Sequence, residues 1–451
     1  MNIDQLVEKY RVAAPRYTSY PTMPYWEQST FDDERWSAAL LHSFQEFPKG
    51  ISLYIHLPFC ESLCTYCGCN TRITKNHGVE IPYIKAVLKE WSLYLAKLGS
   101  VPTIMEIHLG GGTPTFFSPE NLEMLICGIL DKSELHAEAK FSFEAHPGNT
   151  TKAHLSTLFN LGFRRLSLGI QDFDPLVQQI INRIQSVESV EHTTVLAREM
   201  GYNSINYDLI YGLPLQTMEG LYHTIDEVIR LKPDRIAFYS YAHTPWLKPG
   251  QRRYTEEHLP DAELKKNLYE LGRKMLSKAG YHEIGMDHFT LPTDSLYLAE
   301  AQGRLHRNFM GYTEQPSKTL IGLGVSAISD CWTGFAQNEK NVEDYIRVVN
   351  EGKLPVFKGH ILTATDLMMR QHILNIMCTG STEWSATEIS PDIAEAISKL
   401  QVLADDGLLM LSDESLQVSP NGKRFLRNIC MAFDARLWDR KPANQVFSMA
   451  D

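Results

Sequence analysis

Four closely spaced cysteines are the clearest candidates for chemistry in this sequence. Cys60, Cys64, Cys67 and Cys69 give the spacing Cys-x-x-x-Cys-x-x-Cys-x-Cys, directly after an apolar run at residues 52–57. A tight loop of this kind gathers thiolates around one cofactor, and cysteine thiolates are the usual ligands of iron–sulfur clusters. Three protein ligands would leave one iron of a [4Fe-4S] cluster open to another molecule.

Zinc is the main alternative metal for this loop. Structural zinc sites usually join two separated Cys-x-x-Cys or Cys/His halves that hold distant parts of the chain together. Here the second half is missing, because Cys127, Cys331, Cys378 and Cys430 are scattered. The spacing therefore favours an iron–sulfur cluster. A zinc-stabilised regulatory protein without catalysis is the alternative from another functional class.

Short apolar segments between residues 50 and 240 are candidates for the strands that carry this loop. They are rich in β-branched and aromatic residues, and longer amphipathic stretches such as 119–130 and 175–200 separate them. This alternation predicts repeated βα units around a parallel sheet. The predicted strands are residues 52–57, 104–109, 140–145, 165–170, 204–210 and 235–240.

Polar residues fall where these predicted strands end. Gly110-Gly111-Gly112 follows the second strand, and Glu144, Gln171 and Asp208 end the next three. Barrel enzymes collect their functional groups at the carboxyl ends of successive strands in this way. The spacing alone also fits an open doubly wound sheet, but the polar strand ends favour an α/β fold with a partial (β/α)6 barrel.

Further units are expected on either side of the barrel. Residues 1–45 contain a rigid stretch rich in proline and tyrosine, so we expect an N-terminal extension that packs on the barrel as a lid. We assign residues 46–300 to the barrel and residues 301–360 to a connecting segment that packs on it. Residues 361–451 would form a mostly helical C-terminal domain.

The order of elements in this C-terminal domain is typical of a winged-helix unit. Helical patterns near 364–377 and 393–404 precede two short strand-like runs, and a final helix is predicted at 420–437. Acidic residues crowd this region, where a nucleic-acid-binding unit would carry lysine and arginine. We therefore expect a structural or capping role.

Charge and hydropathy argue against several classes of protein. The chain has 43 basic and 54 acidic residues, a net charge of -11, so it repels phosphate backbones. It has no basic N-terminal region followed by an apolar run, and no stretch approaches a membrane span. We expect a cytoplasmic protein without a nucleic-acid partner or a membrane span, in which an anionic substrate needs a local basic pocket.

Motifs far apart in the chain resemble those of one known family. The Cys-x-x-x-Cys-x-x-Cys spacing is the signature of radical S-adenosylmethionine (SAM) enzymes. Cys69, the segment Tyr54-Ile55-His56-Leu57-Pro58-Phe59 and the segment Gly110-Gly111-Gly112-Thr113-Pro114-Thr115 are similar to those of the oxygen-independent coproporphyrinogen III oxidases. The resemblance runs nearly end to end, through residues 15–22, 171–173, 208–214, 285–289, 322–328 and 427–431.

The resemblance implies an oxidoreductase of heme and porphyrin biosynthesis, a coproporphyrinogen dehydrogenase. Cys60, Cys64 and Cys67 would hold a [4Fe-4S] cluster that reduces SAM to methionine and a 5′-deoxyadenosyl radical. The radical would remove a β-hydrogen from a propionate of coproporphyrinogen III, and loss of carbon dioxide and one electron would leave a vinyl group. Two rounds would give protoporphyrinogen IX.

Two SAM molecules are also implied by the resemblance. The residue types suit such a site, because glycines allow close approach of the backbone and an arginine fork pairs with a carboxylate. Positions for the first molecule correspond to Tyr54, Gly111, Gly112, Thr113, Glu144, Gln171, Arg183 and Asp208, with Arg183 expected on the helix after the fourth strand. Positions for the second correspond to Tyr66, Ile210, Ala242 and Ile328. Tyr66 departs from the family pattern, which has phenylalanine there.

Tyr54, His56 and Cys69 are the candidate catalytic residues. His56 would hydrogen-bond a cluster sulfur or tune its potential, and Cys69 would matter without binding the cluster. Arg16 is the candidate for a substrate propionate, because it lies in the segment that would close over the barrel mouth.

A heme-handling relative, either a heme chaperone or a heme-degrading enzyme, is the alternative within the same superfamily. The chaperone branch typically lacks the last cysteine and the N-terminal motif, and both are present here. We expect a monomer that receives electrons from a small donor such as flavodoxin or ferredoxin.

Overall fold

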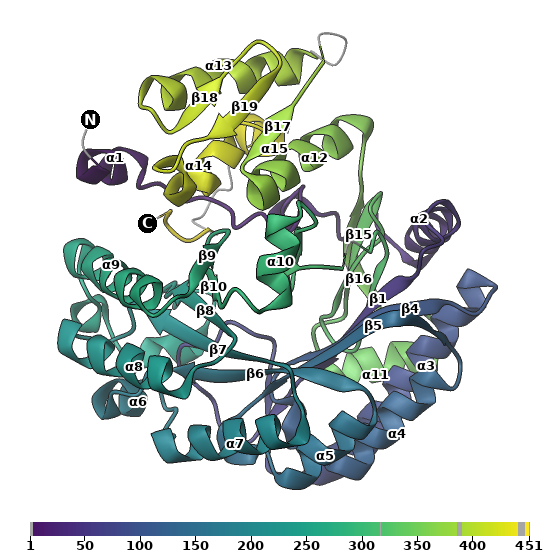
Figure 1. Ribbon diagram of the computed structural model, residues 1–451. Helices are drawn as coiled ribbons and strands as arrows, with labels where there is room; N and C mark the ends of the chain where they lie inside the picture. Colours follow the sequence, from purple (N-terminus) through teal and green to yellow (C-terminus); the bar gives the residue numbers. More distant parts are fainter. Residues whose placement is uncertain (1–2, 316, 386–389, 441–446, 451) are drawn as a thin grey trace.

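The computed structural model describes residues 3–315, 317–385, 390–440 and 447–450. A 12-stranded sheet dominates it and curves into an open barrel (Figure 1). In sheet order the strands are β16 (Val356–Ile361), β15 (Gly334–Asn338), β14 (Ile328–Asp330), β13 (Leu320–Leu323), β1 (Ile51–Leu57), β4 (Thr103–Gly111), β5 (Glu134–Ala145), β6 (Phe163–Gln171), β7 (Ser204–Tyr211), β8 (Arg235–Ser240), β10 (His288–Thr290) and β9 (His282–Ile284).

The six predicted strands form the parallel centre of this sheet. β1 pairs with β4, and β4 to β8 follow in chain order, each parallel to the next. The partial (β/α)6 barrel is therefore confirmed. The segment expected to connect the barrel with the C-terminal domain supplies β13 to β16 to the same sheet, and β13 pairs in parallel with β1.

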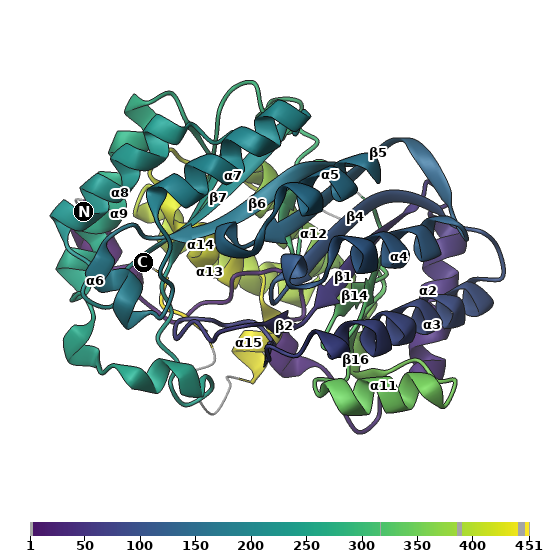
Figure 2. The same ribbon diagram turned by 90° about the horizontal axis from the view of Figure 1, so that it is seen from below.

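Helices cover the outer face of the barrel (Figures 1 and 2). Leu53, Ile55 and Leu57 of β1 belong to the core under these helices, whereas Tyr54 points to the other face and packs with Phe309. Helices of the described chain lack the combined length and apolarity needed to cross a membrane. The main helices are α2 (Asp33–Glu46), α3 (Glu80–Leu98), α4 (Pro119–Leu130), α5 (Lys152–Asn160), α8 (Met218–Leu231), α9 (Ala262–Lys278), α10 (Ser295–Ala301) and α11 (Val342–Asn350).

The stretch 175–200 is two helices, which corrects the single amphipathic stretch predicted from the sequence. α6 (Pro175–Ile180) and α7 (Val187–Met200) are separated by a turn in which Asn182 has a φ of 52°. The Ser186 side chain then accepts a hydrogen bond from Ser189 N–H and begins α7. Arg183 therefore lies in the turn, whereas the sequence had led us to expect it on a helix.

The C-terminal domain has the order of elements that the sequence predicted. α12 (Ala364–Thr379), β17 (Ser381–Glu383), α13 (Pro391–Asp405), β18 (Leu409–Leu411) and β19 (Ser415–Val418) follow one another, and the strands form a small sheet. The predicted final helix is broken into η8 (Gly422–Phe425), α14 (Leu426–Met431) and α15 (Ala435–Asp439). The break places Asp434 where its carboxylate accepts hydrogen bonds from Tyr17 and from the first turn of α15.

The N-terminal segment packs on this C-terminal domain at its start and on the barrel in α2, where Trp36 and Leu40 belong to the barrel core. Leu6 of α1 (Ile3–Tyr10), Tyr17 and Tyr20 belong to the core of the C-terminal domain. Farther along, Trp26 stacks on Phe335 of β15 with ring centroids 5.2 Å apart. The segment thus lies between the domain and the sheet (Figure 1).

One arginine of α14 joins the two ends of the described chain. Arg427 donates hydrogen bonds to the carbonyls of Ala14 and Pro15 and, over 2.7 Å, to the carbonyl of Met449. Ala13 and Met449 also form a short antiparallel bridge. The entry of the chain into the barrel is therefore fixed by residues near its end.

Candidate functional site

Backbone contacts fasten the cysteine loop to the end of β4. Gly112 N–H donates to the Leu57 carbonyl over 2.8 Å, and a Cβ at Gly112 would lie 2.6 Å from the carbonyl carbon of Pro58. The next side chain, Thr113, places its hydroxyl 3.3 Å from Cys60 Sγ. The glycine run and the cysteine loop are therefore one packed unit, which only glycine at position 112 allows.

Gly111 makes room for a histidine under the loop. It has a φ of 115°, and a Cβ there would lie 2.7 Å from the His56 ring. His56 Nε2 lies 2.8 Å from the Asn70 carbonyl, which only accepts, so Nε2 carries the proton and Nδ1 accepts from the Tyr54 hydroxyl over 3.0 Å. Burial lowers the pKa of His56 and keeps the ring neutral.

Both nitrogens of His56 are thus engaged away from the cysteines. In this structure Tyr54 and Asn70 occupy the two polar atoms of the ring, and a role of His56 in tuning the cluster potential stays a prediction. The position of His56 links the first strand to the end of the cysteine loop.

A cavity of about 490 Å³, here called the cofactor cavity, opens beside the loop at the carboxyl ends of the strands. Most site residues predicted from the sequence line it. They are Cys60, Cys64, Tyr66, Cys67, Cys69, Gly111, Gly112, Thr113, Glu144, Gln171, Arg183, Asp208 and Ile210.

Arg183 reaches the cysteines from the turn between α6 and α7. Its guanidinium donates to the Gly169 carbonyl over 2.6 Å, and Nη1 lies 3.6 Å from Cys64 Sγ. A Cβ at Gly169 would lie 2.8 Å from Arg183 Nη2, so glycine at this strand position leaves the guanidinium room beside the strand. The turn that breaks the predicted helix is therefore what brings a cation to the cavity.

Cys67 and Cys69 interact with each other in the loop. A hydrogen bond from Cys69 lowers the pKa of Cys67 to about 6, and the charge of Lys248 acts in the same direction. Lys248 also donates to the Cys69 carbonyl over 3.4 Å. A thiol beside a thiolate supports the expectation that Cys69 stands next to the ligands without being one.

The three candidate ligands suit a cluster better than a single ion. Within the described ranges, no group of three or more His, Cys, Asp or Glu side chains lies close enough to hold one metal ion. A zinc ion would draw its sulfurs to about 2.3 Å from one point. A [4Fe-4S] cluster binds each cysteine to a different iron and needs the space that the cofactor cavity offers beside Cys60, Cys64 and Cys67.

Two carboxylates face the cavity from β5 and β7, the strands on either side of β6. Glu144 accepts from Gly111 N–H over 3.1 Å and lies 3.5 Å from His108 Nε2. Asp208 accepts from the Ser167 hydroxyl and the Asn206 amide. Burial and the charge of Glu144 raise the pKa of Asp208 to about 6. β7 continues to Tyr211, so Asp208 precedes the strand end at which the sequence had placed it.

Besides His56, four predicted site residues lie outside the lining of the cofactor cavity. Tyr54 is buried behind it against His108 and Phe309, and Ala242 adjoins it through Gln251, which donates to the carbonyls of Ala242 and Tyr66. Ile328 lies on β14, packed with Trp26, Phe335 and Leu362. Arg16 forms an ion pair with Asp287 and lies over the Tyr239 ring, a residue that does line the cavity.

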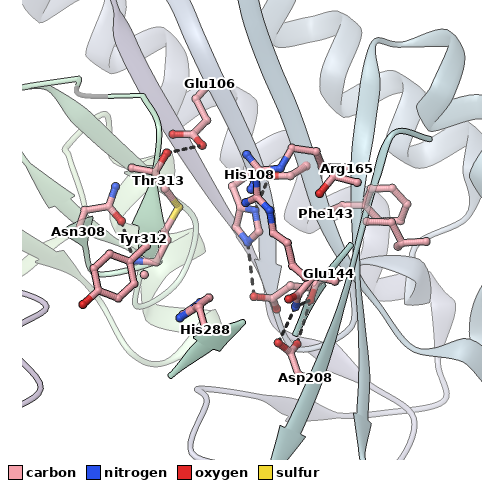
Figure 3. A pocket seen from close by; sticks show the side chains of 18 of the residues that line it. Glu106, His108, Phe143, Glu144, Arg165, Asp208, His288, Asn308, Tyr312 and Thr313 are labelled. Atoms are coloured by element: carbon pink, nitrogen blue, oxygen red, sulfur yellow. Dashed lines mark hydrogen bonds and ion pairs between the residues drawn. The ribbon is translucent and has the colours of Figure 1, made fainter. Parts of the chain in front are cut away.

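A second cavity of about 220 Å³, here called the bore cavity, was missed in the sequence (Figure 3). It lies inside the barrel and is closed by the hairpin of β11 (His306–Asn308) and β12 (Gly311–Thr313). The signal was present as polar residues at every second position, which in a strand share one face. These are Glu106 and His108 in β4, Arg165 and Ser167 in β6, and Ser204, Asn206 and Asp208 in β7.

Comparisons with known proteins agree with this geometry. Residues 54–228 match the model of the Radical SAM superfamily. The oxygen-independent coproporphyrinogen III oxidase of Synechocystis sp. is 38% identical, over 99% of this chain and 97% of the relative, and that of Escherichia coli K12 is 37% identical, over 98% and 97%. The solved structure of coproporphyrinogen III oxidase from Escherichia coli, described as a radical SAM enzyme, superposes with a TM-score of 0.90 at 35% identity, covering 97% of this chain and 100% of that one. The chain therefore belongs to the oxygen-independent coproporphyrinogen III oxidase family.

Proposed function

We propose that this protein is an oxidoreductase that converts two propionates of coproporphyrinogen III to vinyl groups without oxygen, giving protoporphyrinogen IX. One observation carries the proposal. Cys60, Cys64 and Cys67 line the same cavity as Glu144 and Arg183, in a chain of this family. That cavity combines thiolate ligands with groups of both charges, as a zwitterionic cofactor requires.

In this proposal Cys60, Cys64 and Cys67 hold a [4Fe-4S] cluster. When bound, the cluster and SAM supply the one-electron reduction and radical hydrogen abstraction that the reaction needs. The guanidinium of Arg183 pairs with the methionine carboxylate through its planar fork. Glu144 and Asp208 accept hydrogen bonds from amino and ribose groups, and Gly111 and Gly112 let the backbone approach.

A second SAM molecule is part of the proposal. Tyr66 and Ile210 line the cofactor cavity, and Gln251 holds the backbone of Ala242 against that of Tyr66. These contacts support a subsite for the second molecule next to the first. Ile328 has weaker support, because it packs with Trp26 on the far side of β13.

In this proposal Arg16 binds a propionate of the substrate. Its ion pair with Asp287 and its position over Tyr239 support a place at the edge of the cofactor cavity. A propionate that binds there would compete with Asp287 for the guanidinium. Arg16→Ala should weaken coproporphyrinogen III binding, and an unchanged affinity would remove Arg16 from the site.

The electron donor is proposed to be a small acidic protein such as flavodoxin or ferredoxin. Although the whole chain carries a net charge of -11, basic side chains surround the cysteine loop. Lys75 lines the cavity mouth, Lys248 contacts Cys69, and Arg252 and Arg253 are exposed on the loop that follows. Opposite charges speed the encounter of such partners, so reduction should slow as salt is raised. We also propose a cytoplasmic monomer, which light scattering of the purified protein would test.

Anaerobic reconstitution with iron and sulfide, followed by product analysis with coproporphyrinogen III and SAM, tests the function. Protoporphyrinogen IX, carbon dioxide and 5′-deoxyadenosine are the expected products. A heme chaperone would instead retain heme tightly and transfer it without decarboxylation. A colourless protein that binds zinc but no iron or sulfide would contradict the proposal outright.

A further inference from the structure

The bore cavity adjoins the cofactor cavity inside the barrel. The two share four lining residues, Glu144, Ser167, Asp208 and Tyr239. From these shared positions the bore cavity extends toward the amino ends of the strands, to Arg165 of β6. A ligand that enters it must therefore pass directly beside the cofactors.

Two arginines line the bore cavity, Arg165 and Arg235, and Arg235 is already closely paired. Arg235 Nε lies 2.7 Å from Asp294, and Lys140 Nζ lies 2.7 Å from Glu314. Within the part of the chain that the structure describes, Arg165 has its nearest carboxylate oxygen 3.8 Å away, on the same Glu314. Arg165 thus has hydrogen-bond donors to spare.

Figure 3 shows Arg165 among His108, Phe143 and Glu144, facing the hairpin of β11 and β12 across the cavity. A guanidinium carries five N–H donors, and leaving such donors unpaired inside a protein is costly. An oxyanion with two acceptor atoms would satisfy the fork of Arg165. The loosely paired guanidinium of Arg165 therefore indicates a carboxylate ligand.

The acidic groups around Arg165 are compatible with such a ligand. Asp208 is held by Ser167 and Asn206, and Glu144 is held by Gly111 N–H, so both face the boundary between the cavities. Glu106 has only long contacts, 3.4 Å to Ser52 and 3.5 Å to Thr313. Burial raises the pKa of Glu106, which lessens its repulsion of an incoming anion.

We propose that the bore cavity binds one carboxylate-bearing arm of the substrate, with the carboxylate held by Arg165. The inference rests on the proposed function, since coproporphyrinogen III supplies the arm. At about 220 Å³ the bore cavity is smaller than the roughly 300–1,000 Å³ of pockets that enclose a whole ligand. It has room for a two-carbon arm and its carboxylate but not for a tetrapyrrole ring. Arg165 then selects arms that end in a free acid.

The test compares Arg165→Gln with Arg164→Gln in the reconstituted holoenzyme. Arg164 is the matched control, because its guanidinium points to the other side of the strand and donates to the carbonyls of Phe159 and Phe163. Dissociation constants (Kd) for coproporphyrinogen III and for its tetramethyl ester are measured anaerobically without reductant. Iron content and SAM affinity show that each variant is correctly assembled.

R165Q should weaken binding of the free acid by about tenfold or more and leave the ester nearly unchanged, because only the acid forms the charge-assisted pair. R164Q should match the wild type with both compounds. An acid-to-ester ratio that is the same in R165Q and wild type would overturn the proposal. If R165Q does not assemble, R165M carries the same expectation. A wild-type enzyme that binds ester and acid equally would overturn it without any variant.

A different result would contradict the proposed function. A wild-type holoenzyme that forms no vinyl product from coproporphyrinogen III contradicts the reaction itself. A wild-type enzyme that forms the product while R165Q keeps the full preference for the acid contradicts only the role of the bore cavity.

Discussion

The two cavities of the barrel share a wall but are built differently. The cofactor cavity depends on close backbone approach, as at Gly112 against Pro58 and at Gly169 against Arg183. The bore cavity depends on charged side chains paired across strands and helices, such as Arg235 with Asp294. Small changes of volume should therefore damage the first, whereas changes of charge should damage the second.

The largest expected effect is on the cofactor cavity. Cys64→Ala should lower product formation by about 10³-fold or more, because it removes a ligand of the cofactor that does the chemistry. The fold should survive, since the loop is held by backbone hydrogen bonds such as that from Thr65 N–H to the Ile181 carbonyl. Iron content and circular dichroism would be measured. Cys127→Ala, on α4, is the control and should retain both iron and activity.

Removing a buried charge beside the bore cavity should lower the stability of the fold. Asp294→Ala leaves Arg235 buried without its partner, so the free energy of unfolding should fall by about 3–5 kcal/mol. The side chains of this pair are 5% and 1% exposed. Glu191→Ala removes the exposed partner of Arg230, and because solvent screens that pair, the free energy of unfolding should change far less. Urea denaturation compares the two, and equal losses would contradict the distinction between the cavities.

Adding side-chain volume at a glycine beside the cysteine loop should damage the cofactor cavity. Gly111→Ala combines a positive φ with a clash against His56, so we expect a loss of about 2–4 kcal/mol and poorer retention of iron. Gly99 has a φ of 70° but open space around its Cβ position, and Gly99→Ala should cost about 1 kcal/mol. If Gly111→Ala retained iron as well as Gly99→Ala does, the surrounding structure would have to accommodate the clash with His56 without disturbing the cofactor cavity.

The smallest expected effect is a pH dependence of SAM binding. Burial raises the pKa of Asp208 to about 6, and its carboxyl group accepts hydrogen bonds more weakly once protonated, so affinity should fall as the pH drops from 7.5 through 6. Although burial opposes it, the hydrogen bond from His108 lowers the pKa of Glu144, which stays ionised over this range. Isothermal titration of the holoenzyme would follow the change.

Asp208→Asn provides the comparison for this titration. The variant should bind SAM more weakly at pH 7.5, and its affinity should be nearly constant between pH 7.5 and 5.5. The same slope in variant and wild type would assign the titration to another group.

The cofactor cavity could be predicted from the sequence because its parts are short contiguous motifs. The cysteine spacing and the glycine run can be recognised in the sequence without knowing which residues they contact in the fold. Arg183 was expected to line the cofactor cavity, as it does, but on a helix. No local feature of the sequence marks the turn at Asn182 that contains it. Ile328 was assigned from resemblance alone, and its packing with Trp26 depends on where the N-terminal segment runs.

The bore cavity could not be predicted in the same way, because its residues come from strands far apart in the chain. Alternating polar residues mark one face of each strand, but only the closed sheet shows that these faces meet. Which cation is left only loosely paired depends on Asp294 and Glu314, which follow the barrel strands in sequence and were not distinguished from surface acids. Pairing partners, unlike motifs, are a property of the assembled fold.

The contacts of Arg427 have a consequence for the order of events during synthesis. The segment that carries Arg16 cannot be held by Arg427 until residue 427 has been made, roughly 20 to 90 s after translation starts at about 5–20 residues per second. The strands and the cysteine loop emerge long before that. The nascent barrel therefore lacks this clasp until the last part of the chain has been made.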